Sequence, residues 1–175
     1  MTEVDIRALS PGDALAAELL LDAELGGRHQ ARLGEVLDVL ALDGYAAWDG
    51  DRLVGIATCA HGGDRAELAA LAVTADRQRL GIGGRLVEVV ASAARRRGAG
   101  ELWLVTTNDN LEALRLYQRH GFQLSALHAG AVDRARIIKP AIPLLGRHGI
   151  PIHDELILAR PLTGPSGPTS TQLSP

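Results

Sequence analysis

The feature that most constrains this 175-residue chain is a glycine-rich junction, Gly81-Ile82-Gly83-Gly84. The apolar run 68–73 ahead of it predicts a buried strand, and the amphipathic pattern 82–97 behind it predicts a helix. Free backbone N–H groups and the positive end of the helix dipole meet at such a junction, so it favours a bound anion. Glycine also lets a diphosphate approach the backbone, because no Cβ is in the way. The junction therefore predicts a phosphorylated ligand.

Two common nucleotide motifs are excluded by single residues of this junction. A dinucleotide fingerprint requires a third glycine at position 86, which is Leu86, and a P-loop requires a lysine directly after the glycines. What remains is the pattern Gln-x-x-Gly-x-Gly, formed by Gln78, Gly81 and Gly83. On its own this pattern is also compatible with an ordinary tight turn at a helix start.

Length and composition predict one domain over residues 1–162, followed by a disordered Pro/Ser/Thr-rich tail at 163–175. The net charge of −3 gives no basic field for nucleic acid. One cysteine, Cys59, excludes an internal disulfide framework and a Cys-rich metal site, and its apolar surroundings predict a buried structural thiol. The N-terminus lacks the apolar stretch of a signal peptide, and no apolar run reaches membrane-spanning length, so we expect a cytoplasmic protein with no membrane partner.

Periodicity and turn residues predict an α/β fold with the order β-α-α-β-β-β-α-β-α-β-β. An antiparallel half should be followed by βαβ crossovers. The expected strands are 4–9, 45–48, 53–60, 67–73, 102–106, 122–127 and 155–159. The expected helices are 13–25, 30–42, 82–97 and one opened by Asp109 as a capping residue, with a short helix at 131–138 before an irregular segment.

A second motif follows the junction after one strand: Asn110-x-x-Ala113-x-x-x-Tyr117-x-x-x-Gly121-Phe122. Together with Gln78-x-x-Gly81-x-Gly83 it resembles the two signatures of the GNAT superfamily of N-acetyltransferases, in particular a bacterial subgroup of undefined substrate. The resemblance runs from about residue 4 to 160. It implies a GNAT-type mixed, largely antiparallel twisted sheet flanked by helices. Leu80 departs from the family pattern, where a small or basic residue is commoner.

The resemblance implies acetyl-CoA as co-substrate and no metal. The residues that would bind it lie on the strand before the junction, in the junction and at the start of the next helix. They are Leu71, Ala72, Val73, Gln78, Arg79, Leu80, Gly81, Ile82, Gly83, Gly84, Arg85 and Asn110. The arginines Arg77, Arg79 and Arg85 could supply positive charge to the phosphates or could equally be surface residues.

For catalysis the resemblance implies Glu67 as the general base that deprotonates the amine. Tyr117 would be the acid that protonates the departing CoA thiolate, and backbone N–H groups of the strand would stabilise the oxyanion. Both residues have a plainer interpretation: Glu67 could be a solvated carboxylate at a strand end, and Tyr117 a core aromatic.

These expectations add up to an N-acetyltransferase that moves an acetyl group to a primary amine by direct attack in a ternary complex. A small molecule rather than a protein is the expected acceptor, and a homodimer is possible. The alternative is a non-catalytic CoA-binding regulatory or interaction module. In the segment 139–155 and just before it, Asp154 and Glu155, or His128, His148 and His153, could recognise a cationic amine. Rigid Pro-rich packing against the sheet is the other interpretation of that segment.

Overall fold

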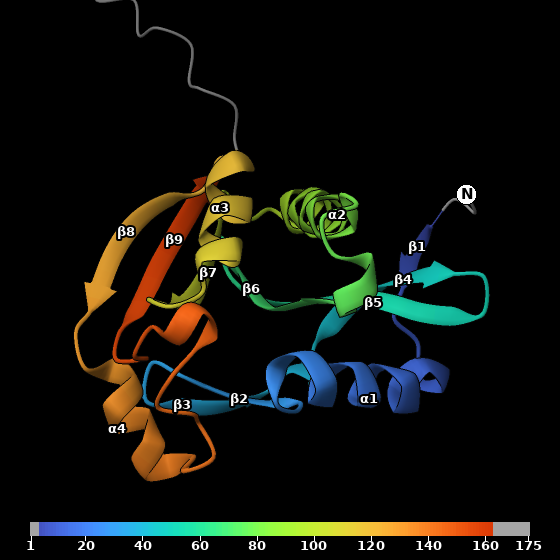
Figure 1. Ribbon diagram of the computed structural model, residues 1–175. Helices are drawn as coiled ribbons and strands as arrows, with labels where there is room; N and C mark the ends of the chain where they lie inside the picture. The colour runs from blue at the N-terminus through green and yellow to red at the C-terminus, as the bar shows by residue number, and fades with distance from the viewer. Residues whose placement is uncertain (1–3, 163–175) are drawn as a thin grey trace, which may run out of the picture.

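The computed structural model describes residues 4–162, and a twisted sheet of seven strands forms its middle layer (Figure 1). The strands are β1 (Asp5–Ala8), β2 (His29–Arg32), β3 (Glu35–Asp38), β4 (Asp43–Asp49), β5 (Arg52–Gly62), β6 (Arg65–Val73), β7 (Glu101–Thr107), β8 (Gln123–His128) and β9 (Glu155–Pro161). The helices are α1 (Ala14–Leu25), α2 (Ile82–Arg96), α3 (Leu111–Arg119) and α4 (Ala131–Ile138). The tail prediction for 163–175 lies outside the described residues.

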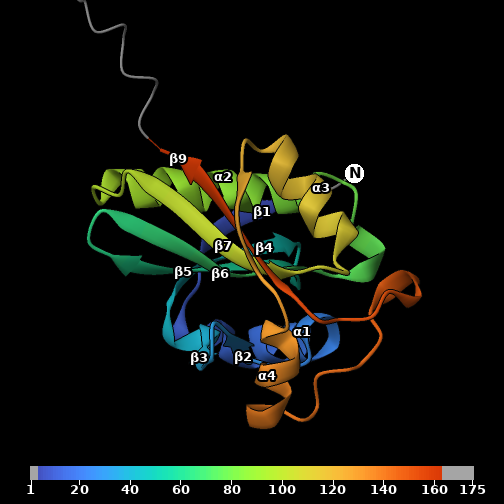
Figure 2. The same cartoon turned by 90° about the vertical axis from the view of Figure 1, so that its left-hand side faces the viewer.

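The sheet has the order β1-β4-β5-β6-β7-β9-β8, and β2 and β3 form a separate hairpin. Every neighbouring pair in the large sheet is antiparallel except β6 and β7, which are joined by the α2 crossover. Helices α2 and α3 cover one face, whereas α1, the hairpin and α4 lie on the other (Figures 1 and 2). The predicted fold class, a largely antiparallel mixed sheet flanked by helices, is confirmed.

The core has two layers, one on each face of the sheet. Along β5, Ile56 packs into the layer under α1 and Ala57 into the layer under α2, as strand alternation requires. Gly55 lets α2 approach β5, because a Cβ there would lie 3.0 Å from Leu86 Cδ1. Each fully buried leucine such as Leu86 contributes about 2 kcal/mol to the free energy of unfolding. The predicted burial of Cys59 is confirmed, and that burial raises the pKa of its thiol to about 11.

The helix predicted over residues 30–42 is wrong, because most of this segment is the β2–β3 hairpin. Its turn residues Leu33 and Gly34 have φ of 50° and 79°, a left-handed pair that a helix cannot contain. The apolar residues of the segment do have helical spacing, but contacts from outside it decide the conformation. Lys139 Nζ donates to the His29 carbonyl at 2.7 Å, and the Leu33 N–H donates to the Glu155 side chain.

The ends of the other helices follow the sequence more closely. Gly98 after α2 has φ of 92°, and the Ala99 N–H bonds the Ala94 carbonyl, a glycine-terminated helix end that agrees with the predicted limit at residue 97. At α3 the capping prediction is off by one residue: Asn110, not Asp109, is the N-cap, and its side chain accepts the Ala113 N–H at 3.3 Å.

Candidate active site

The start of α2 is a helix N-terminus with no side-chain cap. Gly81, the N-cap, has φ of 83°, and nothing lies within 4 Å of where its Cβ would be. The first helical hydrogen bond runs from the Arg85 N–H to the Gly81 carbonyl at 3.1 Å. The N–H groups of residues 82–84 therefore have no helical acceptor and point toward the loop. This is the geometry of a backbone anion site.

The loop side chains predicted to bind the donor have partners within the chain or face outward. Gln78 Nε2 donates to the Val73 carbonyl at 2.9 Å and to Glu24 at 3.2 Å, so it ties the loop to β6 and α1. Arg79 has φ of 65°, and Leu80 is 63% exposed. Gln78, predicted to bind the donor, therefore has a structural role in the loop.

The three arginines near the junction differ in their partners. Arg77 is paired with Asp49, and Arg85 donates to the Val4 carbonyl at 2.9 Å. Arg79 forms no ion pair with any residue of the described range. Within residues 4–162, Arg79 is the one of the three whose guanidinium has neither an ion pair nor a hydrogen bond.

Helix α3 packs closely on the first turn of α2. Gly83 sits beside α3, with its Cβ position 3.4 Å from Leu116 Cδ2, and a Cβ on Gly84 would lie 2.5 Å from His120 Nε2. Ile82 is buried. The burial of Ile82 agrees with its place in the amphipathic pattern, whereas the packing role of Gly84 was not indicated by the sequence. An open groove of about 600 Å³ borders this turn and is lined by Asp5, Ile6, Gly81, Gly84, Arg85, Glu88, Val89 and His120.

Strands β6 and β7 separate just before the junction. Their parallel pairing covers only Arg65–Glu67 on β6. From Leu68 onward the β7-facing edge of β6, which includes Leu71, Ala72 and Val73, has no strand partner in the described sheet. The register shift of β6 against β5 falls at Ala69, two residues before Leu71, the first of the predicted donor-binding residues on this strand. The separation leaves backbone groups available beside the anion site.

Glu67 lies where β6 and β7 begin to separate, and it is 5% exposed. Its carboxylate accepts from Arg32 Nε at 3.0 Å and from Nη2 at 2.8 Å, a two-bonded ion pair. Arg32 also reaches Glu35 at 3.2 Å. The plainer interpretation of Glu67, a solvated carboxylate at a strand end, is therefore wrong, and its role as a base stays a prediction. Glu67 is buried, and Arg32, which sequence reasoning missed, is its partner.

A second buried carboxylate fixes the tip of the hairpin. Glu155 is 2% exposed, and its two oxygens lie 3.0 and 3.2 Å from the Leu33 nitrogen. Leu33 directly follows Arg32, so β9 and β6 hold adjacent residues of the hairpin tip. The hairpin thereby lies across the opening between β6 and β7. Gly34 at the turn was the sequence signal for this element, because the apolar residues around it have helical spacing.

Tyr117 is buried on α3, with its ring edge-on to Phe122 at a centroid distance of 5.6 Å. Burial raises the pKa of its hydroxyl. The hydroxyl therefore keeps its proton at neutral pH, which an acid requires. Asn110, predicted to bind the donor, caps the same helix.

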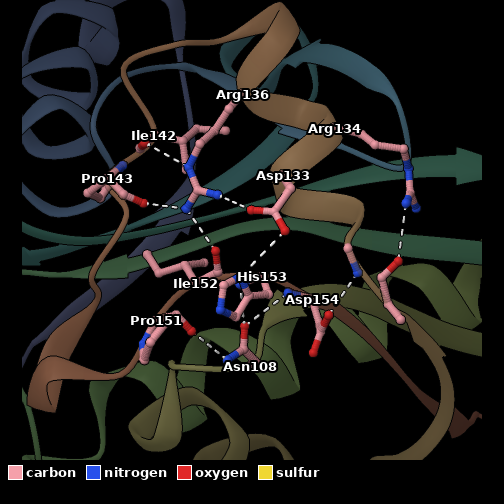
Figure 3. Close-up of polar contacts among 12 residues, drawn as sticks. Asn108, Asp133, Arg134, Arg136, Ile142, Pro143, Pro151, Ile152, His153 and Asp154 are labelled. Atoms are coloured by element: carbon pink, nitrogen blue, oxygen red, sulfur yellow. Dashed lines mark hydrogen bonds and ion pairs between the residues drawn. The ribbon is translucent and has the colours of Figure 1, made fainter.

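The segment 139–154 is organised around Arg136 on α4 (Figure 3). The guanidinium donates to the carbonyls of Pro143 at 2.6 Å and Ile152 at 2.8 Å, and to Asp133 at 2.6 Å. This one side chain closes the segment against the helix.

Asn108 joins the same segment to the end of β7 (Figure 3). It accepts the N–H groups of His153 and Asp154, each at 3.0 Å, and donates to the Pro151 carbonyl at 2.9 Å. Asp154 in turn accepts the Gly130 N–H at 2.8 Å. These contacts fit the packing interpretation of the segment.

The histidines do not converge. His148 pairs with Glu112 at 2.9 Å and His153 with Asp133 at 3.4 Å, while His128 is exposed on β8. In residues 4–162 no group of three or more His, Cys, Asp or Glu is placed to hold a metal ion. Within the same range, none of the helices has the length and apolar character needed to cross a membrane.

An uncapped helix start beside two separating strands defines a class of protein with a backbone anion site next to unpaired strand groups. The comparisons agree, because the profile of the acetyltransferase (GNAT) family matches residues 16–122. The chain belongs to this family of acetyl-CoA-dependent acyltransferases.

Individual relatives and structures are consistent with this family. The uncharacterised protein YxbD of Bacillus subtilis (strain 168) is 41% identical over 122 residues, 69% of this chain and 76% of YxbD. A streptothricin acetyltransferase of Streptomyces lavendulae is 39% identical over 109 residues, 52% of this chain and 57% of that protein. A B. subtilis acetyltransferase solved in complex with CoA superposes with a TM-score of 0.73 at 22% identity, covering 92% of this chain and 100% of that one.

Proposed function

We propose that this chain transfers the acetyl group of acetyl-CoA to a primary amine, by direct attack in a ternary complex. The observation that carries the proposal is the uncapped N-terminus of α2 directly beside the unpaired edge of β6. The anion site suits a diphosphate, and the neighbouring row of free backbone groups suits an extended arm that contains amides. Both are parts of CoA.

In this proposal the diphosphate accepts hydrogen bonds from the N–H groups of residues 82–84, and Arg79 adds positive charge. The pantetheine arm runs along Leu71, Ala72 and Val73. The groove beside Gly81 and Gly84 is a place for the adenosine end. A backbone N–H directed at the developing oxyanion would lower the barrier by about 3 kcal/mol.

The acid and the base come from opposite faces of the sheet. Tyr117, whose hydroxyl stays protonated, donates to the leaving thiolate. Glu67 takes the proton of the amine. In the described state Arg32 compensates the charge of Glu67, so the ammonium form of the acceptor would replace Arg32 as the cationic partner. That exchange would require the hairpin tip to move.

The acceptor would enter on the face that carries the hairpin and α4, opposite α2. Buried carboxylates Glu67 and Glu155 stand on this side, and the net charge of −3 also suits a cationic amine. We therefore expect a small amine with further positive charge. Streptothricin is a first compound to try, because a relative is named for its acetylation.

One observation favours the alternative, a CoA-binding module without turnover. Arg32 donates to both oxygens of Glu67. Such an ion pair can stabilise the fold in a protein that has no catalytic activity. The two proposals share the donor site and differ only on the acceptor side.

Two measurements separate these possibilities. Acetyl-CoA at about 100-fold over its Kd should add about 2.7 kcal/mol to the free energy of unfolding, read as a rise in Tm. Release of CoA thiol is then followed with a panel of polyamines, streptothricin, amino acids and N-terminal peptides. Thiol release with one amine class supports the enzyme, and binding without release across the panel supports the module. No rise in Tm would contradict both.

A further inference from the structure

Trp103 on β7 stands beside Glu67, on the face of the sheet that carries the hairpin. The two residues are directly opposite in the short parallel pairing of β6 and β7, so their side chains leave the same face on strands about 4.8 Å apart. Leu102 and Leu104, the neighbours of Trp103, are buried in the core layer under α2, which leaves the indole to the opposite face. Trp103 is partly exposed there, so its ring is open to a ligand that reaches Glu67.

A guanidinium of the chain already lies on this indole. The guanidinium carbon of Arg65 is 5.4 Å from the centre of the Trp103 ring, which is the distance of a cation–π contact. Its Nε and Nη2 lie 2.7 and 2.6 Å from Oε1 of Glu101. The ring and the carboxylate together therefore form a site for a planar cation, with a π face below it and an acceptor at its rim.

Arg65 is weakly held at this site. Its side chain is 52% exposed and that of Glu101 is 36% exposed, and an ion pair in such surroundings contributes little to stability. The guanidinium of a ligand can take the place of Arg65 at small cost. The exchange keeps one cation on the ring and the carboxylate, and it returns Arg65 to water.

Two arginines of the chain thus occupy neighbouring positions on one face of the sheet. Arg32 pairs with Glu67. Beside it, Arg65 lies on Trp103. A molecule with an amine at one end and a planar cation at the other would replace both.

We propose that the acceptor carries a guanidinium, which binds between Trp103 and Glu101 while the primary amine lies at Glu67. The place of the amine rests on the proposed function, whereas the guanidinium site rests on contacts within the described chain. A guanidinium suits the site better than an ammonium does, because it is planar, stacks on aromatic faces and is more weakly hydrated. The second cation should therefore discriminate between amines of equal length.

Three matched amines test the second cation. Agmatine carries a guanidinium four methylenes from its amine, 1,5-diaminopentane places an ammonium at the same number of bonds, and pentylamine has no second charge. In CoA thiol release with acetyl-CoA, kcat/KM for agmatine should exceed that for 1,5-diaminopentane about fivefold, and pentylamine should be the poorest of the three. A kcat/KM for agmatine equal to or below that for 1,5-diaminopentane would overturn the proposal.

Substitutions at the site should act in opposite directions. Trp103→Leu keeps an apolar side chain and removes the π face, so agmatine should lose its advantage over 1,5-diaminopentane. This ratio, taken within one variant, does not depend on how much of that variant is folded. Arg65→Gln removes the competing guanidinium, so the KM of agmatine should decrease about threefold. Arg96→Gln, at an exposed arginine on α2 that bonds Ser92, is the matched control and should resemble wild type.

Two results with these variants would refute the guanidinium site. One is a Trp103→Leu variant that keeps the wild-type preference for agmatine. The other is an increase in the KM of agmatine in Arg65→Gln, because the proposal requires Arg65 to compete with the ligand.

Fluorescence tests the site without catalysis. Trp48→Phe leaves Trp103 as the single tryptophan of the chain and removes an indole N–H that has no partner within residues 4–162, so the fold should tolerate it. Agmatine added to this variant with bound CoA should change the emission in a saturable way. Binding of agmatine without thiol release from acetyl-CoA would support the guanidinium site and contradict the proposed transfer. Thiol release with other amines and no response to agmatine would do the reverse.

Discussion

At the scale of single residues, Tyr117 combines a packing role with a chemical one. Tyr117→Phe keeps the ring against Phe122 and removes only the hydroxyl, so Tm should stay unchanged. Because a thiolate is a fair leaving group, we expect kcat to fall by about 100-fold, the lower end for general acids. The Kd of acetyl-CoA, measured by titration, should remain the same. An unchanged kcat would remove Tyr117 from the mechanism.

Substitutions in the Glu67–Arg32 ion pair distinguish a catalytic base from a structural carboxylate at position 67. Arg32→Gln leaves the buried Glu67 without its counter-ion and should lose about 3 kcal/mol of stability, whereas Glu67→Gln leaves Arg32 with Glu35 as an ionic partner and should lose less. Only Glu67→Gln removes the proton acceptor, and its kcat should fall by about 100-fold or more. Urea unfolding and steady-state rates on both variants make the comparison. Equal loss of activity in the two would indicate a structural role for Glu67.

At the scale of elements, the first turn of α2 should bind the donor through its backbone. Gly83→Ala places a methyl group 3.4 Å from Leu116, an ordinary contact, so the fold should tolerate it. The same methyl obstructs a diphosphate at the N–H groups of residues 82–84, and we expect the Kd of acetyl-CoA to rise about tenfold. Calorimetric titration measures it. Gly100→Ala, where the nearest atom is 3.8 Å away, is the control and should bind like wild type.

The elements also show how far a sequence can be interpreted before the structure is known. The α2 junction was predictable, because a strand, glycines and an amphipathic helix follow one another within 30 residues and need no distant partner. The β2–β3 hairpin was not, since its conformation depends on Lys139 and Glu155, more than 100 residues away. The ion pair of Glu67 was missed for the same reason: its partner Arg32 sits on that hairpin.

At the scale of the whole molecule, ion pairs connect elements that the sheet alone does not join. Arg7 on β1 bonds Asp13, which precedes α1, at 2.9 and 3.1 Å. Arg52 on β5 bonds Asp76, just before the glycine junction, at 2.7 and 2.9 Å. The first contact links the edge strand β1 to the start of α1. The second links the β4–β5 hairpin to the segment before the glycine junction. Their charges make the stability of the fold depend on pH.

Acid should weaken the fold in a defined window. The Arg7 guanidinium lowers the pKa of Asp13 to about 2, and the Arg52 guanidinium does the same for Asp76. A carboxyl whose pKa is lower in the folded than in the unfolded chain stabilises above its unfolded value, near 4, and loses that contribution as pH falls through the folded value. Tm should therefore drop between about pH 4 and pH 2.

The two carboxyls should contribute unequally to this drop. The Asp76 side chain is 52% exposed, so solvent screens its pair, whereas that of Asp13 is only 8% exposed. Asp13→Asn should lower Tm at pH 6 by more than Asp76→Asn does. It should also reduce the decrease in Tm below pH 4 by more than Asp76→Asn does. Asp51→Asn, at an exposed turn residue, should leave the pH profile unchanged. A wild-type slope in Asp13→Asn would mean that other carboxyls, such as Glu88, whose pKa the bonded Arg160 lowers, govern acid unfolding.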